Sequence, residues 1–191
     1  METKNIMIVG VGGQGTLLAS KILGHVLLSQ NFDVKVSEVH GMAQRGGCVV
    51  THVRMSQRVY SPLIHRGEAD AILAFEPMEA LRYMDFIRED GVVITAADRV
   101  LPISVAMGQG TYPEDIMERV HARCSRVLTV DGAALAKEAG SLMTLNIVLL
   151  GAFTAMLNLD REAMEAAVAD SVKPQFVEMN RIAFGLGYGL V

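Results

Sequence analysis

The sequence predicts an α/β fold, a sandwich of helices around a mixed and mainly parallel sheet. Short runs of apolar and β-branched residues alternate with helical patterns through residues 1–130, as in proteins with parallel sheets. A cluster of glycines follows the first of these runs and leads directly into a helical pattern. From residue 131 onward the chain is helical. We therefore expect one domain over residues 1–191, with a helical C-terminal part at about 131–191.

The first two elements flank the glycine cluster. Residues 6–9 are apolar and uncharged, which predicts a buried strand. Gly10, Gly12 and Gly15 then fit the pattern GxGxxG, whose glycines permit a tight turn and a close approach of backbone N–H groups to a ligand. A helix is expected over residues 16–29, with its N-terminus available to an anion. The same glycines also serve helix–strand packing alone, so both interpretations stay open.

The next segments predict two strands separated by a loop. Residues 33–39 and 48–55 alternate in polarity, and the second run is rich in β-branched side chains. Residues 41–47 between them are polar and bounded by glycines, which predicts a loop. We expect residues 48–55 to pair with residues 59–61 in an antiparallel hairpin, which makes the sheet mixed.

Strands and helices continue to alternate up to residue 130. Residues 71–75 predict a short buried strand, and Pro77 suits the first turn of the helix that follows it. Two further strands are expected at residues 91–96 and 127–130, with a helix at about 113–124 between them.

Capping residues divide the helical part. Asp131 and Asp160 each precede a helical run as an N-cap, and Gly140 ends the first of these helices. The glycine-rich residues 185–189 predict a flexible tail. The helices are expected at residues 131–137, 142–159 and 160–172 and after Pro174. The second is apolar but contains threonines and asparagines, so we expect a buried helix rather than a membrane span.

Composition narrows the function classes. The chain is 51% hydrophobic, with 12 methionines and no tryptophan, and its formal net charge is −4. No Lys/Arg cluster is present to follow a phosphate backbone, so nucleic acid is not an expected partner. Only two cysteines occur, Cys48 and Cys124, in no CxxC spacing. This argues for a reducing compartment and against an iron–sulfur or zinc site held by this chain alone. No signal peptide is expected, and the cytoplasm is the predicted location.

The second glycine loop carries three polar candidates. Glu38 lies 23 residues beyond Gly15, near the position where a dinucleotide-binding acid would meet a ribose hydroxyl; it also fits the exposed end of a strand. Arg45 can bind a phosphate or carboxylate as a bidentate fork, or form a surface ion pair. His40 and His52 have no partners at metal-ligand spacing, so no metal site is expected. Both glycine loops follow strands expected to be neighbours, and should lie side by side at one edge of the sheet.

These two loops together resemble a known family. The run GVGGQG at residues 10–15, followed by SEVHGMAQRGG at residues 37–47, resembles the gamma-type module of the 2-oxoacid:ferredoxin oxidoreductases, especially its indolepyruvate branch. The resemblance covers essentially the whole chain, including NIVLLG at residues 146–151. The pair of motifs is far more specific than either alone. The resemblance implies a three-layer α/β/α sandwich with a Rossmann-like glycine loop, not a nicotinamide-binding domain.

The resemblance also implies a reaction and a partner. The family oxidatively decarboxylates 2-oxoacids, arylpyruvates in the indolepyruvate branch, with coenzyme A as acyl acceptor and ferredoxin as electron acceptor. A large alpha subunit carries thiamine diphosphate, Mg²⁺ and the 4Fe-4S clusters, and this chain lacks a Gly-Asp-Gly…Asn motif for thiamine diphosphate. The chain is therefore expected to bind no cofactor alone, to be inactive alone, and to form a heterotetramer or heterodimer with that subunit. Ferredoxin is expected to interact with the complex through that large subunit.

The expected cofactor-binding or interface residues share the two loops and the long helix, and no catalytic residue is assigned. They are Gly10, Gly12, Gly13, Gln14, Gly15, Glu38, His40, Gln44, Arg45, Gly46, Gly47 and Asn146. Three alternatives remain. The first is a gamma subunit for another 2-oxoacid, namely pyruvate, 2-oxoglutarate or a branched-chain 2-oxoacid. The second is a free-standing nucleotide-binding module, and the third is a scaffold whose glycine loops serve packing alone.

Overall fold

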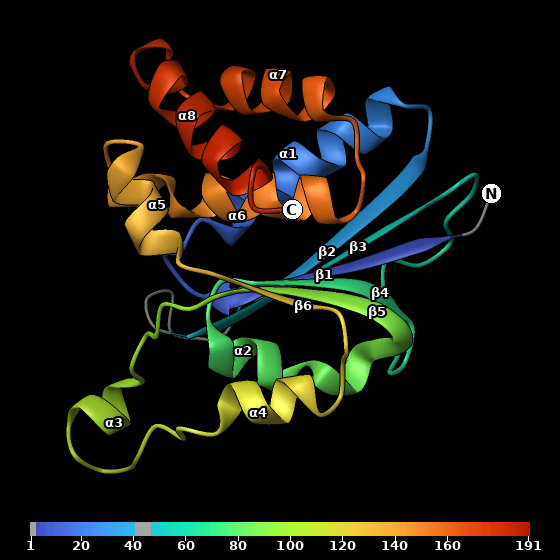
Figure 1. Ribbon diagram of the computed structural model, residues 1–191. Helices are drawn as coiled ribbons and strands as arrows, with labels where there is room; N and C mark the ends of the chain where they lie inside the picture. Colours follow the sequence, from blue (N-terminus) through green and yellow to red (C-terminus); the bar gives the residue numbers. More distant parts are fainter. Residues whose placement is uncertain (1–2, 41–46) are drawn as a thin grey trace.

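The computed structural model describes residues 3–40 and 47–191, and a sheet runs through the middle of this part of the chain (Figure 1). Its strands are β1 (Lys4–Val11), β2 (Asp33–His40), β3 (Cys48–Ser56), β4 (Ala69–Ala74), β5 (Ile87–Ala96) and β6 (Val127–Val130). The strand order is β2-β3-β1-β4-β5-β6. Strands β1, β4, β5 and β6 pair in parallel, whereas β3 is antiparallel to both β1 and β2. The sheet is therefore mixed and mainly parallel, as predicted.

Helices cover both faces of the sheet. They are α1 (Thr16–Ser29), α2 (Pro77–Arg82), α3 (Ile103–Ala106), α4 (Ile116–His121), α5 (Gly132–Glu138), α6 (Leu145–Met156), α7 (Arg161–Ser171) and α8 (Val177–Tyr188). Short 3-10 turns lie at η1 (Met84–Phe86), η2 (Leu142–Thr144) and η3 (Pro174–Phe176). Figure 1 shows α1 and α5 to α8 above the sheet and α2 and α4 below it, which confirms the three-layer arrangement. Helix α3 projects from the body of the molecule.

Strand β1 lies at the centre of the core. Ile6 and Ile8 point into the cluster under α1 and α6, whereas Met7 and Val9 point into the cluster over α2 and α4. All four side chains are buried. Alternate residues thus serve opposite layers, which is why this run is apolar throughout. Among the described residues, no helix is both long enough and apolar enough to cross a membrane.

The predicted hairpin between residues 48–55 and 59–61 is wrong. Strand β3 instead lies between β1 and β2, with Cys48 opposite Val11 and Ser56 opposite Asp33. Residues 59–61 form no strand. The backbone N–H of Val59 donates to Oδ2 of Asp33 at 2.7 Å, so a side chain satisfies the group that a strand pairing would have used.

The predicted flexible tail at residues 185–189 is also wrong, because α8 continues through Tyr188. Helices α6 and α8 pack with their backbones in contact. A Cβ added at Gly187 would collide with the Val148 carbonyl, and one added at Gly151 would collide with the Phe184 carbonyl. The glycines here allow a close helix–helix approach rather than ending the helix.

Other boundaries differ by a few residues. The helix predicted at 113–124 is the shorter α4, and the stretch predicted as one helix at 142–159 divides into η2 and α6. The two predicted N-caps are confirmed: Oδ1 of Asp131 accepts from Ala134 N–H at 3.1 Å, and Oδ1 of Asp160 accepts from Ala163 N–H at 3.0 Å.

Candidate functional site

The first glycine loop connects the carboxyl end of β1 to α1. Gly13 and Gly15 have φ values of +103° and +83°, in the left-handed region that favours glycine. Gly15 is the N-cap of α1, and no side chain caps the helix there. The N–H of Gly12 donates to the carbonyl oxygen of Gly47 at 2.8 Å. The first loop thus meets the described end of the second, as predicted, although the strands β1 and β2 before these loops are not neighbours.

Gln14 stabilises the loop from within. Its Oε1 accepts from the N–H of Val11 at 2.7 Å, and its Nε2 donates to the carbonyl oxygen of Phe75 at 2.8 Å. Phe75 directly follows β4, so one side chain joins the ends of two parallel strands. The Gln14 amide therefore holds the end of β1 against the residue that follows β4.

Asn146 packs against the same loop from the first turn of α6. Its side chain is 6% exposed, and a Cβ added at Gly15 would lie 2.6 Å from Nδ2. Within the described part of the chain, Asn146 Oδ1 is buried without a hydrogen-bond partner. A hollow of about 350 Å³ lies beside these groups and is lined by Gly13, Gln14, Gly15, Leu18, Leu142, Met143, Leu145 and Asn146. This hollow combines a helix N-terminus with an unsatisfied polar atom and an apolar rim.

Glu38 is not placed as a dinucleotide-binding acid would be. It lies on β2 opposite Thr51 of β3, and β3 separates it from β1. In the dinucleotide-binding fold the second strand lies directly beside the first, which brings its acid next to the glycine loop. The strand order here therefore argues against a nicotinamide dinucleotide at this loop.

The other expected residues of the second loop are placed only in part. His40 ends β2, opposite Val49 of β3. Gln44, Arg45 and Gly46 lie outside the described residues. Gly47 is placed by its contact with Gly12.

A cluster of polar side chains at the start of β3, made by Cys48, Glu79 and Tyr83, was not predicted. Cys48 Sγ donates to Oε2 of Glu79 at 2.8 Å and lies 3.3 Å from the hydroxyl of Tyr83. Burial raises the pKa of the Cys48 thiol, and its hydrogen bond to Glu79 raises that pKa further. Burial also raises the pKa of Tyr83. The thiol is thus kept protonated and poorly nucleophilic. No sequence signal pairs Cys48 with Glu79, because the two residues are 31 positions apart in the chain.

Glu76 has a second role besides capping α2. Its Oε2 accepts from the N–H of Glu79 at 3.1 Å. Its Oε1 accepts from the N–H of Val100 at 3.3 Å and from the hydroxyl of Tyr112. The side chain of Glu76 is 1% exposed, so this carboxylate is a buried junction between α2 and the segment that carries α3.

The residues of this chain do not fit an iron–sulfur cluster. Residues 3–40 and 47–191 contain no group of three His, Cys, Asp or Glu side chains able to hold a metal ion. The whole sequence has two cysteines, whereas a cluster of this class needs four thiolates. Cys124 lies elsewhere, with its Sγ 3.4 Å from the carbonyl oxygen of Gly91.

Comparisons with known proteins agree with this architecture. Residues 5–190 match the family described as pyruvate ferredoxin/flavodoxin oxidoreductase. The chain is 43% identical over 192 residues to the indolepyruvate oxidoreductase subunit IorB of Pyrococcus horikoshii, covering 98% of this chain and 95% of that protein. It is 31% identical over 188 residues to the 2-oxoglutarate synthase subunit KorC of Methanocaldococcus jannaschii, covering 97% and 92%.

A solved structure gives the same result. The gamma subunit of a keto/oxoacid ferredoxin oxidoreductase from Geobacter sulfurreducens superposes with a TM-score of 0.73 and 27% identity, covering 97% of this chain and 96% of that one. Fold and sequence thus agree over nearly the full length. The chain therefore belongs to the pyruvate ferredoxin/flavodoxin oxidoreductase family.

Proposed function

We propose that this chain is the small subunit of an indolepyruvate:ferredoxin oxidoreductase. The observation that carries the proposal is the 43% identity to an indolepyruvate oxidoreductase subunit over nearly all of both chains. The strand order supports it, because β3 between β1 and β2 is unlike a nicotinamide-binding domain. Residues 1–191 then form one gamma-type domain that acts in the cytoplasm.

The reaction converts an arylpyruvate and coenzyme A into an arylacetyl-CoA and CO₂. The C1–C2 bond breaks, a thioester bond forms, the thiol proton is released, and two electrons pass to oxidised ferredoxin. Thiamine diphosphate with Mg²⁺ supplies the carbanion chemistry and 4Fe-4S clusters conduct the electrons. Because the residues of this chain do not fit a cluster, we place these groups on the large alpha subunit.

The part played by this chain lies at the carboxyl edge of its sheet. The Gly15 N-cap, the buried Asn146 and the hollow beside them form a surface that combines a largely apolar lining with the backbone N–H groups at the start of α1. We assign the interface or coenzyme A contact to the residues expected from the sequence: Gly10, Gly12, Gly13, Gln14, Gly15, Glu38, His40, Gln44, Arg45, Gly46, Gly47 and Asn146. Within this set, Gln14 acts as an internal brace.

Reconstitution tests the proposal. The purified chain alone should be colourless and inactive, whereas a mixture with the large subunit should reduce a low-potential dye when indolepyruvate and coenzyme A are both present. Turnover of indolepyruvate by this chain alone would refute the subunit assignment. Failure of the two subunits to form an active complex would also refute it.

A second candidate concerns the substrate alone. The 31% identity to a 2-oxoglutarate synthase subunit shows that the same module serves another 2-oxoacid. The ratio of kcat/KM for indolepyruvate and 2-oxoglutarate in the reconstituted complex decides between them, and we expect it to favour indolepyruvate.

A further inference from the structure

Residues 100–112, here called the arm, join β5 to the segment before α4. Figure 1 shows the arm, with α3 in it, extending away from both helical layers. Leu101, Ile103 and Met107 are 53%, 67% and 66% exposed, and no residue of α3 is buried. Large apolar side chains that gather on one exposed segment mark a binding surface rather than ordinary surface composition.

The arm also lacks charge. No Asp, Glu, Lys or Arg occurs between Arg99 and Glu114, although these residues make up 20% of the chain. An exposed segment normally carries charges, because they keep it solvated. The centres of protein interfaces are depleted in charged residues. Absence of charge and exposure of apolar side chains are independent observations, and both indicate burial against another protein.

The base of the arm is held firmly. Glu76 accepts hydrogen bonds from Val100 N–H and from the Tyr112 hydroxyl, so one buried carboxylate fixes both ends of the arm. The Arg99 guanidinium lies over the Tyr112 ring, 5.2 Å from its centroid. Just before the arm, Oδ2 of Asp98 accepts from the N–H of Ala133 at 3.0 Å. The arm is therefore presented in a defined place before any partner binds, which lowers the entropy cost of binding.

The arm is continuous with the end of the sheet that carries the two glycine loops, here called the glycine-loop edge. Val100 and Leu101 line a hollow of about 120 Å³ together with Val11 and Cys48, which lie at the ends of the two glycine loops. Met143, which is 84% exposed, lines the hollow on the other side of the first loop. The base of the arm thus lies next to the glycine loops, so a partner that covers the loops can also contact the arm.

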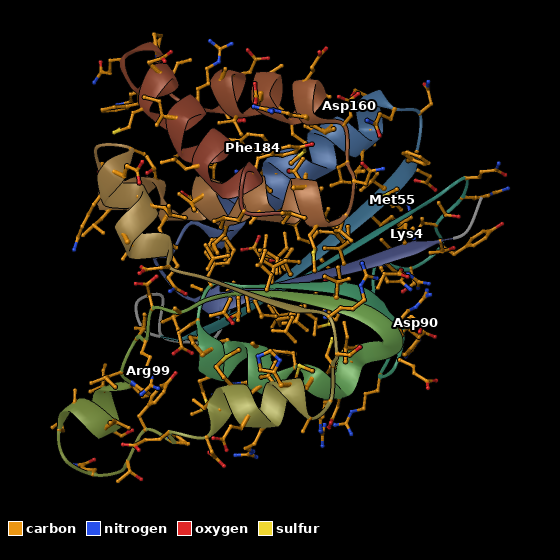
Figure 2. The ribbon with its side chains drawn as sticks, viewed as in Figure 1. Lys4, Met55, Asp90, Arg99, Asp160 and Phe184 are labelled. Atoms are coloured by element: carbon orange, nitrogen blue, oxygen red, sulfur yellow. The ribbon has the colours of Figure 1, made fainter. Side chains whose placement is uncertain are left out.

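A second copy of this chain does not fit the arm well. Contact between two arms would offer 13 residues from each copy, whereas a stable interface needs about 20–30 residues a side. The larger apolar crevice, about 420 Å³, lies at the opposite end of β1 and is lined by Ile6, Leu27 and Phe32 among others. Figure 2 shows Lys4 and Asp160 of this crevice far from Arg99 at the base of the arm. Arm-to-crevice contacts would join two different surfaces that lie far apart on the molecule, a geometry typical of head-to-tail rings and filaments rather than of a compact two-fold dimer.

We propose that the arm inserts into an uncharged apolar groove on the large subunit, continuous with the contact made by the glycine-loop edge. This inference rests on the proposed function, which supplies the large subunit. The apolar side chains of Ile103 and Met107 are then the anchors, and the buried Glu76 holds the arm in the position that the groove accepts.

Binding of the separately purified, cofactor-loaded large subunit tests this inference. I103D and M107D should each weaken the affinity by about 30-fold or more, as for a buried apolar anchor. I182D is the matched control, because Ile182 is 44% exposed on α8 in the other helical layer, and it should leave the affinity unchanged. Thermal unfolding and circular dichroism of each variant alone should match the wild type, because these side chains support no core.

The outcomes distinguish failure of the inference about the arm from failure of the proposed function. If wild type binds the large subunit and both arm variants bind equally well, the arm is not in the interface, and the proposed function stands. If wild type does not bind the large subunit, the proposed function fails and the inference fails with it. If sedimentation shows an oligomer of this chain alone that I103D dissociates, with no effect on large-subunit binding, the arm contacts a second copy and the inference is overturned.

Discussion

Gln14 holds Phe75 through a hydrogen bond of 2.8 Å from Nε2 to the backbone carbonyl, across the carboxyl edge of the sheet. Because Oε1 of the same amide accepts from Val11 N–H, the side chain is fixed at the end of β1, and the glycine loop cannot move away from β4 without losing the bond to Phe75. The loop is therefore built as a rigid surface rather than as a phosphate cradle that closes on a ligand.

Replacement of Gln14 by alanine should destabilise the protein. The loss of two partly buried hydrogen bonds predicts a fall of about 1–3 kcal/mol in the free energy of unfolding. Urea denaturation followed by circular dichroism measures this change. Q57A is the control, since Gln57 is exposed, and it should shift stability by less than about 0.5 kcal/mol. Equal stability of Q14A and Q57A would contradict the bracing role.

Gly13 and Gly15 should differ in their tolerance of alanine. Both have positive φ, which costs about 1–2 kcal/mol for an L-residue. A Cβ at Gly13 meets nothing within 4 Å, whereas one at Gly15 meets Asn146. G15A should therefore be less stable than G13A by at least about 1 kcal/mol. A double-mutant cycle with N146A should remove that excess, and an excess that persists in N146A would exclude Asn146 as its cause.

The two glycines of α8 provide a similar contrast. A Cβ at Gly187 collides with the backbone of α6, whereas one at Gly185 meets nothing within 4 Å. G187A should lose about 3 kcal/mol or more of unfolding free energy. G185A should instead gain about 0.5–1 kcal/mol, because alanine favours the helix over glycine. Thermal denaturation of both variants distinguishes close helix packing from a frayed tail, for which both substitutions would be neutral.

The Cys48 thiol should titrate above the ordinary range for cysteine. Burial and Glu79 raise the pKa of this thiol in the folded state, so folding favours the protonated form. The stability that the protonated thiol contributes is fully present below the unfolded-state pKa and is lost as the pH rises from that value through the folded-state pKa. In a C124A background, iodoacetamide alkylation against pH should show a midpoint above that of a free thiol. E79Q should move this midpoint downward and speed alkylation at pH 8. An unchanged midpoint in E79Q would rule out the carboxylate as a cause.

Arg45 remains a prediction from sequence, since it lies outside the described residues. If its guanidinium binds a carboxylate or phosphate of substrate, coenzyme A or the partner, R45A should lower activity of the reconstituted complex about 10- to 150-fold, the equivalent of 1.5–3 kcal/mol. R45K should recover only part of this loss, because lysine lacks the planar fork. Kinetics at several coenzyme A concentrations measure it, with circular dichroism as the folding control. Wild-type rates for R45A would leave Arg45 an ordinary surface charge.

Local patterns predicted most elements of the fold. The helix after the first glycine loop and the strand at residues 127–130 have the predicted bounds, and Asp131 and Asp160 cap as expected. The position of β3 was missed, because a strand's pairing partners depend on distant residues and not on its own alternation. The helical role of Gly187 was missed for the same reason, since only the α6 backbone explains it.

The placement of the two glycine loops was predicted in part, whereas the assignment of their residues to a cofactor or interface stays a prediction. The glycine patterns placed both loops at one edge of the sheet, and the contact between Gly12 and Gly47 agrees with that. Sequence could not reveal that Gln14 binds Phe75 or that Glu76 binds Tyr112, because these partners are 61 and 36 residues apart. The arm carried a usable signal, the uncharged interval between Arg99 and Glu114, but no periodicity that would mark an element.

The place of β3 in the sheet also bears on synthesis of the chain. Strands β1 and β2 leave the ribosome before the strand that joins them, so the nascent chain holds two unpaired strands until residues 48–56 emerge. Unpaired strands invite association with other chains. The β2–β3 pair is close in sequence and can form as soon as β3 is made, and its addition to β1 then closes the gap. The sheet is thus assembled out of chain order, with the third strand entering between the first two.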